Sequence, residues 1–358
     1  MKDIEHQLLA AVRRHPMATQ QQLANELGIS RESVAAYISR LMKSGQILGK
    51  GYLLPEPRHV VVLGGANVDI SGRSTAAFIP GDSNPGSVHQ SAGGVGRNIA
   101  ENLVRLGHDV SLVTMLGQDT HGDWLLRQMQ QAGIQTGGVL RDPDCTTGTY
   151  LALNNAAGEL VAAIAAMAIA DALTPERLSA VQPLLVSADI LVVEANVPEA
   201  TLAWLASLPL RGSLYADAVS TSKAPRLRPL LPKLTGLKVN LSEARALLGE
   251  PDSSTEAAAK GLLARGVQQV MLSLGNKGLA RVDANETVEL PSYSVDIVSD
   301  TGAGDALLAG LIHAQYRGYD AHQQTAFALA CAAITLNSEH ANAPQLTEQQ
   351  VLEWIAQH

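Results

Sequence analysis

The sequence is poor in residues that form crosslinks or metal sites. Its 358 residues include two cysteines, Cys145 and Cys331, which are too few for a disulfide framework and lack metal-ligand spacing. Aromatic side chains make up 3% of the chain, whereas hydrophobic residues of all kinds make up 46%. A core of the size that this content allows must therefore consist mainly of Leu, Val, Ile and Ala.

Segments for membrane insertion and a common nucleotide-binding motif are also missing. The N-terminus has no basic stretch followed by an apolar run, as a signal peptide would. The longest apolar run, near residues 160–170, is too short to cross a bilayer. We therefore expect a cytoplasmic protein with no membrane partner. The pattern G-x-x-x-x-G-K-[ST] does not occur, which argues against a P-loop NTPase.

Charge is distributed unevenly along the chain. Residues 1–58 contain eight Lys and Arg against five Asp and Glu, whereas the remainder contains 18 against 29. The net charge of −8 thus combines a small basic N-terminal part with a large acidic body. This asymmetry indicates that the N-terminal part contacts an anionic partner and that the body does not.

The N-terminal part shows three short segments with apolar residues at helical spacing. Pro16 ends the first segment, Thr19 is expected to cap the second, and Ser30 is expected to cap the third. Residues 46–54 have the pattern of a small hairpin. Three short helices followed by a hairpin predict a winged helix-turn-helix domain, which we place at residues 1–54.

The third segment is the candidate DNA-binding helix, because in this arrangement it enters the major groove. Its arginines suit base edges or phosphates, and the lysines suit phosphates. The DNA-binding candidates are Ser30, Arg31, Ser33, Tyr37, Arg40, Lys43 and Lys50. One such domain binds weakly, so a homodimer on a two-part site is expected. The alternative is a protein-interaction or dimerisation module whose cations are only solvated.

A stiff Pro-Glu-Pro-Arg linker at residues 55–58 precedes a body at residues 59–358. Apolar strand patterns alternate with helical patterns in the body, which predicts a three-layer α/β fold with a mostly parallel sheet. Strands are expected at 60–64, 110–115, 190–194, 213–217, 237–240 and 269–274. Helices are expected near 95–106, 120–132, 198–206, 242–248, 255–265 and 305–317. Ligands of such folds bind beyond the carboxyl ends of the strands.

Two glycine-rich segments of the body each precede a helix. In the first, residues 92–98 (AGGVGRN), glycines allow a ligand to approach the backbone, although such turns are also common as purely structural features. In the second, residues 301–305 (TGAGD), small residues leave N–H groups at a helix N-terminus, which is an anion site. Asp305 beside that site suits a general base for a hydroxyl group, or it only favours the helix dipole.

Taken together, the segments AGGVGRNIAENLVRLG with Gly117 and TGAGD resemble the signatures of the PfkB/ribokinase family of carbohydrate and nucleoside kinases. The resemblance covers about residues 59–356. It implies a ribokinase-like three-layer α/β/α fold with a small β-lid, which we place at about 70–92 and 145–165. It also implies an ATP-dependent kinase that uses Mg²⁺.

The resemblance further implies functional residues. The catalytic set is Asp305 as base with the backbone of Gly302, Ala303 and Gly304 as anion hole. The substrate-binding set is Asn67, Asp69, Ser83, Asn84, Gly93, Gly94, Arg97, Asn98, Thr149, Asn196 and Asp305. The ATP-binding set is Asp217, Lys223, Asn240, Glu243, Ser273, Gly275, Gly278, Thr301, Gly302 and Gly304, with Mg²⁺ held by Asn240 and Glu243, partly through water. Asn240 could instead be a turn residue and Glu243 a first-turn helix acid, and the lid residues could form a polar turn.

Several segments resemble the pseudouridine kinases more than ribokinase or fructokinase. They are GDSNPGSVHQ, GTYLALNNAAGELVAAI, VEANV and YADAVSTSK. The chain departs from the family pattern at two places. Ser299 occupies a position where the family often has an Asp that assists a monovalent-cation site, which leaves K⁺ activation open. Ala165, Ala166 and Ala168 stand where polar residues are expected. Ala166 is either natural variation or a deliberate substitution at a substrate-contacting lid position, and in the second case the chain could bind substrate but turn over poorly.

The leading hypothesis is a kinase that transfers phosphate from ATP to the 5′-hydroxyl of pseudouridine and also binds DNA as a regulator. One alternative is a sugar or other nucleoside kinase of the same family. The other is a transcription regulator whose kinase-like body only senses a ligand. An intact TGAGD segment argues against the last hypothesis, because a sensor does not need a general base.

Overall fold

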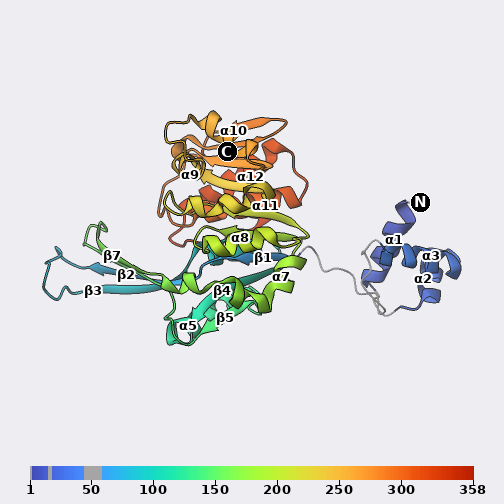
Figure 1. Ribbon diagram of the computed structural model, residues 1–358, viewed down its shortest axis with the longest axis horizontal. Coiled ribbons are helices and arrows are strands. Elements are labelled where there is room, and N and C mark those ends of the chain that lie inside the picture. Colours follow the sequence, from blue (N-terminus) through green and yellow to red (C-terminus); the bar gives the residue numbers. More distant parts are fainter. Residues whose placement is uncertain (1, 15–17, 44–58) are drawn as a thin grey trace. The chain divides into compact units, whose positions relative to one another are not determined.

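The computed structural model describes residues 2–14, 18–43 and 59–358. They belong to two compact units, one within residues 1–58 and one at residues 59–358 (Figure 1). The predicted hairpin at 46–54 and the linker at 55–58 lie outside the described residues. Among the described residues, no helix combines the length and apolar character needed to cross a bilayer.

The N-terminal unit contains helices α1 (Lys2–Arg14), α2 (Gln20–Leu27) and α3 (Arg31–Lys43). The expected caps are confirmed: the Thr19 side chain accepts a hydrogen bond from the Gln22 amide in a capping box, and Ser30 Oγ accepts one from the Ser33 amide at 3.1 Å. Gly28 ends α2 with a left-handed φ of 64°. The three helices enclose a small core of Leu8, Ala11, Val12, Leu23, Ala24, Val34, Ile38 and Leu41.

The body is built on a nine-stranded sheet with the order β13-β12-β11-β10-β9-β8-β1-β4-β5. Pairing is parallel from β11 to β5, and β12 and β13 join antiparallel at one edge. The predicted mostly parallel sheet is thus confirmed. The strands are β1 (Val60–Leu63), β4 (Val110–Gly117), β5 (Val139–Asp142), β8 (Ile190–Glu194), β9 (Ser213–Asp217), β10 (Gly236–Asn240), β11 (Gln269–Ser273), β12 (Leu279–Asp283) and β13 (Thr287–Leu290).

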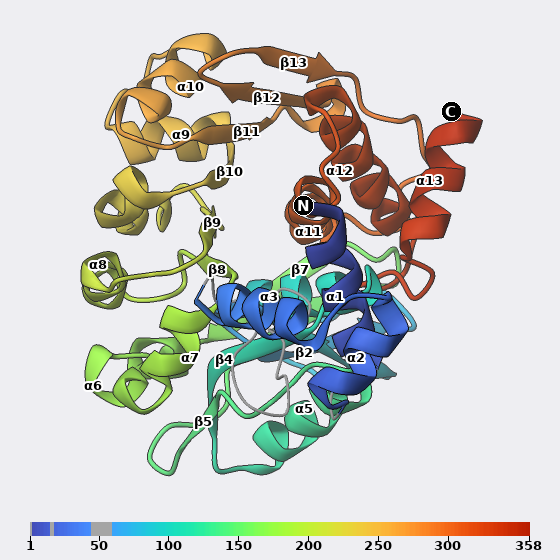
Figure 2. The same ribbon diagram turned by 90° about the vertical axis from the view of Figure 1, so that its right-hand side faces the viewer.

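Helices cover both faces of this sheet (Figure 2). Side chains alternate along β1, so that Val61 and Leu63 pack into one core while Val60 and Val62 pack into the other. The first core is covered by α6 (Pro175–Leu178), α7 (Gln182–Ser187), α8 (Glu199–Ser207), α9 (Leu241–Leu248), α10 (Thr255–Ala264) and the 3₁₀ segments Ala168–Ala172 and Ala224–Lys233. The second is covered by α4 (Val95–Arg105), α5 (Thr120–Gln131), α11 (Ala303–Tyr316), α12 (Ala321–Leu336) and α13 (Glu348–Gln357).

A second, four-stranded sheet projects from the body (Figure 1). Its order is β3-β2-β6-β7, with β2 at Asn67–Ser74, β3 at Gly86–Gly93, β6 at Thr149–Asn154 and β7 at Leu160–Ala166. All seven residues of β7 are exposed, although the strand is apolar. We call this sheet the lid, since it occupies the position that the resemblance assigns to a lid.

The expected strands and helices of the body are present, with ends within two residues of the expected ones. The sequence pattern did not reveal α12, because this helix is apolar around most of its circumference and almost wholly buried. A helix of that kind shows no single apolar stripe. The edge strands β12 and β13 were also missed, since their short, mixed sequences lack the continuous apolar run of the central strands.

Leu262 of α10 provides a test of the first core, because its side chain is fully buried there. We expect Leu262→Ala to lower the free energy of unfolding by about 2–5 kcal/mol, since it removes buried methyl groups and leaves a cavity. Leu352→Ala is the control, because Leu352 is 44% exposed and should cost less than about 0.5 kcal/mol. Urea unfolding followed by circular dichroism measures both, and equal losses would contradict this assignment of the core.

Candidate active site

The candidate site lies where the connections of two neighbouring parallel strands diverge. From β1 the chain continues through lid strands and α4 to β4 on one side, whereas from β8 it continues through α8 to β9 on the other. Such a switch point leaves a crevice at the carboxyl ends of the strands. A cavity of about 480 Å³ is found there.

The cavity has a polar end and an apolar wall. The polar end contains residues from β2, α4 and α11 and from the loops that follow β1 and β8, and the apolar wall comes from β4, the lid and the region of the 3₁₀ segment Ala168–Ala172. The polar lining includes Asn67, Asp69, Asn98, Asn196, Lys223, Thr301 and Asp305. The apolar lining includes Met115, Tyr150, Ala165, Met167, Ile169, Ala170 and Leu173.

Glycines allow α4 to approach the end of β1. A Cβ atom on Gly96 would lie 2.7 Å from the Cα atom of Gly64, which no side chain can accommodate. Gly94 has a φ of 102°, and its Cβ atom would lie 2.5 Å from the carbonyl oxygen of Gly65. The motif at residues 92–98 is therefore needed for this close approach, which brings Asn98 to the cavity.

Asp69 lies on β2 beside the cavity, and its position depends on two neighbours. Asn67 Nδ2 donates a hydrogen bond of 2.6 Å to Asp69 Oδ1. A Cβ atom on Gly93 would lie 2.1 Å from Asp69 Oδ2, so only glycine leaves room for this carboxylate. Burial raises the pKa of Asp69, although the hydrogen bond from Asn67 and the charge of Arg97 oppose the increase.

The helix α11 begins beside the cavity with Gly302 as its N-cap residue, at a φ of 85°. A Cβ atom there would lie 2.1 Å from the carbonyl oxygen of Ala341, and this position therefore requires glycine. Glycine offers no side-chain cap, and the first-turn N–H groups have no partner within the helix. This arrangement is suited to bind an anion next to Asp305, which lies in the same turn.

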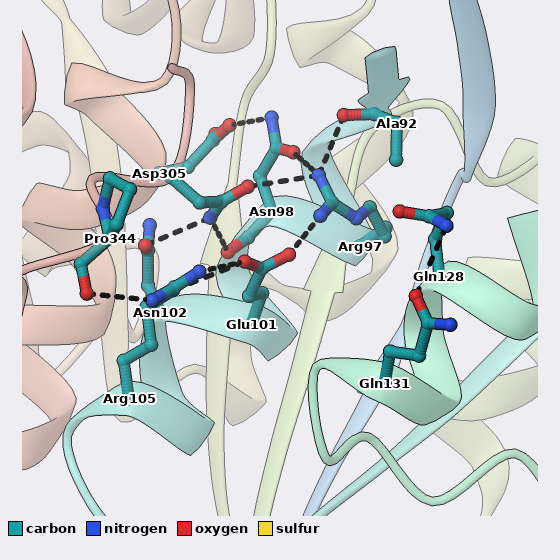
Figure 3. A network of polar contacts seen from close by, with 11 residues as sticks. Ala92, Arg97, Asn98, Glu101, Asn102, Arg105, Gln128, Gln131, Asp305 and Pro344 are labelled. Carbon is teal, nitrogen blue, oxygen red and sulfur yellow. Dashed lines mark hydrogen bonds and ion pairs between the residues drawn. The ribbon is translucent and has the colours of Figure 1, made fainter. Parts of the chain in front are cut away.

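Asp305 is buried and receives a hydrogen bond of 2.8 Å from Asn98 Nδ2 (Figure 3). The two glycine-rich motifs thus meet in one site. Burial raises the pKa of Asp305 to about 7, and the nearby charge of Asp217 adds to the increase. The hydrogen bond from Asn98 and the charge of Lys238 act in the opposite direction. Asp305 can therefore exchange a proton near neutral pH, as a general base must.

Lys238 is a functional candidate that the sequence analysis missed. It lies in β10, and its Nζ atom is 3.1 Å from Asp217 Oδ2. A Cβ atom on Gly304 would lie 2.8 Å from the same Nζ atom, which places the ammonium group against the first turn of α11. Burial acts to lower the pKa of Lys238, but nearby carboxylates more than offset this effect. A lysine within an otherwise buried apolar strand was the available signal.

Glu194 was also missed, although it ends β8 at the switch point. Its carboxylate accepts hydrogen bonds of 2.6 Å from the backbone amides of Gly65 and Asn196, and it joins the ends of β1 and β8. Burial raises the pKa of Glu194 to about 7. The predicted Asn196 and Lys223 line the cavity and contact each other through Asn196 Oδ1 and Lys223 Nζ.

The residues expected at the ATP and Mg²⁺ side are divided: Lys223, Thr301 and Gly302 line this cavity, whereas the lining does not include Asn240, Glu243, Ser273, Gly275 and Gly278. Asn240 and Glu243 form a capping box at the start of α9, with two reciprocal hydrogen bonds of 2.8 Å. In the structure, Asn240 and Glu243 therefore form the helix cap that was the alternative to a role in ATP and Mg²⁺ binding. Ser273 ends β11, and Gly275 and Gly278 form the turn before β12. Within the described residues, no group of three or more His, Cys, Asp or Glu side chains forms a metal site.

The structure does not bring every predicted substrate contact to the cavity. Ser83 is exposed and Asn84 is half-buried in the β2–β3 loop, where the Asn84 side chain forms hydrogen bonds with the backbone of Ile79 and Asp82, as expected for a polar turn. Thr149 Oγ1 donates to the carbonyl of its neighbour Thr147 instead. Ser83, Asn84 and Thr149 are absent from the cavity lining.

The three alanines of the expected polar segment occupy different places. Ala165 lines the cavity, whereas Ala166 pairs with Thr149 in the lid ladder and Ala168 begins the 3₁₀ segment. Ala166 was the position expected to contact the substrate. The cavity lining indicates Ala165 instead, because the two side chains of adjacent strand residues point to opposite faces.

The expected DNA-contacting residues fall into three groups. Arg31 and Arg40 are exposed, and the Arg40 guanidinium lies 4.6 Å from the centre of the Tyr37 ring. Tyr37 itself packs partly against the helix core, and Ser30 and Ser33 are engaged in the cap of α3. The side chain of Lys43, and Lys50 altogether, lie outside the described part of the chain.

Comparisons with known proteins agree with this geometry. The pfkB family carbohydrate kinase model matches residues 57–348, and a winged helix-turn-helix DNA-binding model matches residues 1–47. The uncharacterized sugar kinase YeiI of Escherichia coli is 35% identical, over 99% of both chains. The pseudouridine kinase of Escherichia coli is 33% identical, over 84% of this chain and 97% of its own.

The fold is also that of a solved kinase. The carbohydrate kinase from Agrobacterium tumefaciens superimposes with a TM-score of 0.76 at 32% sequence identity, over 84% of this chain and 97% of its own. The two family models together match residues 1–47 and 57–348 of this chain. The chain therefore belongs to the pfkB family of carbohydrate kinases and carries a winged helix-turn-helix domain at its N-terminus.

Proposed function

We propose that this chain transfers the γ-phosphoryl group of ATP to the 5′-hydroxyl of pseudouridine, giving pseudouridine 5′-phosphate and ADP. The proposal rests on one observation, namely that a single cavity has both a polar end, at Asp69, Asn98 and Asp305, and an apolar wall. About 480 Å³ is within the range of small-molecule sites and leaves room for more than a sugar ring.

The two ends of the cavity suit the two parts of a nucleoside. Groups such as the Asp69 carboxylate and the Asn67 amide suit the hydroxyl groups of ribose, because the carboxylate accepts hydrogen bonds and the amide both donates and accepts them. The wall at Tyr150, Met167 and Ile169 suits the flat, largely apolar face of a base. A free pentose would leave that wall without a partner. The 33% identity to a pseudouridine kinase supports the choice of nucleoside.

The chemistry follows from the first turn of α11. As the substrate hydroxyl oxygen attacks the γ-phosphorus, Asp305 accepts the hydroxyl proton and the bond from the γ-phosphorus to the β–γ bridging oxygen breaks. The N–H groups of residues 302–304 and the ammonium of Lys238 hold the charge that develops on the phosphoryl oxygens. Asn98 keeps its hydrogen bond to Asp305 and holds the carboxylate in place.

The charges around the site fit ATP as its Mg²⁺ complex. The charge of Asp217 raises the pKa values of Glu194, Glu243 and Asp305, so negative charge is in excess beside Lys238. Free ATP would add to this excess, whereas Mg²⁺ supplies positive charge when bound. Asn240 and Glu243 would hold the ion, partly through water, from their capping box. The predicted ATP residues at Ser273, Gly275 and Gly278 belong to the same proposal.

The N-terminal domain supports a second function, namely sequence-specific DNA binding. The observation that favours it is the helix-turn-helix with Arg31 and Arg40 exposed on α3. The chain would then be a cytoplasmic kinase that also regulates genes connected with its substrate. A homodimer is proposed because a single such domain reads only one half-site.

A panel of acceptors tests the substrate. With ATP and Mg²⁺, we expect pseudouridine to give the highest kcat/KM among pseudouridine, uridine, ribose and fructose, because only a nucleoside fills both ends of the cavity. A coupled assay of ADP release measures this, with acceptor-free ATP hydrolysis as the background. A higher kcat/KM with ribose or fructose would contradict the proposal of pseudouridine as the substrate, but it would still show that the chain is a kinase. Ligand binding without turnover of any acceptor would favour a sensor.

Asp305 should act as a base whose pKa lies near 7. Because only the ionised carboxylate accepts a proton, we expect kcat/KM to fall as the pH decreases through about 7. Asp305→Asn should lower kcat by about 10²–10⁴-fold at all pH values. Asp296→Asn is the control, because Asp296 is exposed in the segment before α11. Retention of more than about one tenth of kcat by Asp305→Asn would rule out this role.

DNA binding should depend on α3. We expect the full-length protein to shift DNA from upstream of its own gene, and Arg40→Ala to weaken this binding by about tenfold. Arg127→Ala removes the same charge from an exposed site on α5 and should leave binding unchanged. Mobility shifts at physiological salt, with and without pseudouridine, measure both. Equal affinity for unrelated DNA would exclude sequence-specific recognition.

A further inference from the structure

Behind the polar end of the cavity lies a buried network that the proposed chemistry does not use directly (Figure 3). Arg97, Glu101 and Arg105 are four residues apart and therefore share one face of α4. Glu101 accepts from both arginines. Arg97 and Glu101 are almost fully buried, so this network is part of the interior rather than a surface ion pair.

The network determines which way the Asn98 side-chain amide faces. Its Oδ1 atom accepts a hydrogen bond of 2.9 Å from Arg97 Nη1, and its Nδ2 atom donates to Asp305 Oδ2 at 2.8 Å. A reversed amide would place Nδ2 against a guanidinium and Oδ1 against a carboxylate, and both contacts would be repulsive. The position of the Arg97 guanidinium therefore selects the orientation in which Asn98 donates to Asp305.

Arg97 is in turn held by Asn342, from the segment between α12 and α13. Arg97 Nη1 donates to Asn342 Oδ1 at 2.9 Å and to the carbonyl of Ala92 at 2.7 Å. Asn342 Nδ2 donates at 2.8 Å to the backbone carbonyl of Asn98 and to Asn102 Oδ1. Asn342 is 5% exposed, and it is separated from Asn98 by 244 residues.

We propose that Asn342 is a positioning residue for the general base, which holds Arg97 so that the Asn98 amide presents Nδ2 to Asp305. This proposal rests on the proposed function in that it takes Asp305 as the base. Asn342 contacts both the backbone of Asn98 and the group that orients its side chain. Asn342 therefore fixes both the position of the Asn98 backbone and the orientation of the Asn98 amide that donates to Asp305.

The consequence concerns the ionised form of Asp305. A donor from Asn98 stabilises the carboxylate and opposes the effect of burial on the pKa of Asp305. If the Asn98 amide reverses, its Oδ1 atom accepts from the protonated acid instead and favours the form that cannot act as a base. Loss of Asn342 should thus move the titration of Asp305 to higher pH.

A purely structural role for Asn342 makes a different prediction, and the chain offers a matched control. Arg105 Nη1 donates to the carbonyl of Pro344 at 2.9 Å, so it ties the same segment to α4 without contacting Asn98. Arg105→Gln should loosen that tie and leave the Asn98 amide in place. Asn342→Leu removes both the donor and the acceptor of the side-chain amide while it keeps a side chain of similar size. Asn342→Ser is a second, smaller replacement.

The experiment measures the titration of the Asp305 carboxyl group in the full-length protein, directly by NMR and indirectly by the pH dependence of activity. Carboxyl ¹³C NMR, with the Asp305 signal assigned by its loss in Asp305→Asn, gives the titration midpoint without turnover. We expect Asn342→Leu and Asn342→Ser to raise that midpoint by about one pH unit, and Arg105→Gln to leave it unchanged. In the kinase assay, kcat of Asn342→Leu should fall about tenfold at pH 6.5 and recover toward the wild-type value at pH 9, with KM little changed. Thermal melts confirm that each variant is folded.

The outcomes separate the two proposals. An unchanged midpoint in both Asn342 variants, or an equal change in Arg105→Gln, would overturn the positioning role. A loss of kcat that is the same at pH 6.5 and pH 9 would do so as well. If Asp305→Asn keeps its activity, the proposed base is wrong, yet the NMR midpoints still decide whether Asn342 controls the hydrogen bond to Asp305.

Discussion

The hydrogen bond from Asn98 to Asp305 is the contact on which the rest of the site depends. It joins the first turns of α4 and α11, which are 207 residues apart in the sequence. The bond forms only because glycines at positions 94, 96 and 302 let the two helix N-termini approach neighbouring backbone. Once the helices meet, the first turn of α11, the Asp305 carboxylate and other polar side chains line one cavity.

The pKa values of the carboxyl groups in the site result from opposing effects of burial and of nearby hydrogen-bond donors and positive charge. Burial raises the pKa values of Glu194, Glu243 and Asp305, and the charge of Asp217 adds to the increase in each of them. Lys238 and the amide donors of Asn98, Gly65 and Asn196 offset part of this effect. The result is an acid at Asp305 whose pKa lies close to 7, where proton exchange is most useful for catalysis.

Much of the fold was accessible from local patterns, because strand and helix periodicity are local properties. The Thr19 and Ser30 caps, the central strands and the glycine-rich turns all follow from residue types and spacing. Glu243 shows the limit of such reasoning, since the same acid can cap a helix or face a metal. Ser83 and Asn84 show it too, because a polar loop and a substrate contact have the same composition.

The sequence by itself determined the class of protein: two glycine-rich motifs with an acid after the second, in an alternating strand–helix body, behind a basic helical domain. The glycine-rich motifs can be recognised in the sequence because a close approach of two backbone segments excludes every residue other than glycine. Only the tertiary structure decided that Lys238 lies against α11, that Ala165 lines the cavity, and that Asn342 holds Arg97. These contacts join residues that are distant along the chain, and no local pattern of spacing or composition specifies which distant side chains meet.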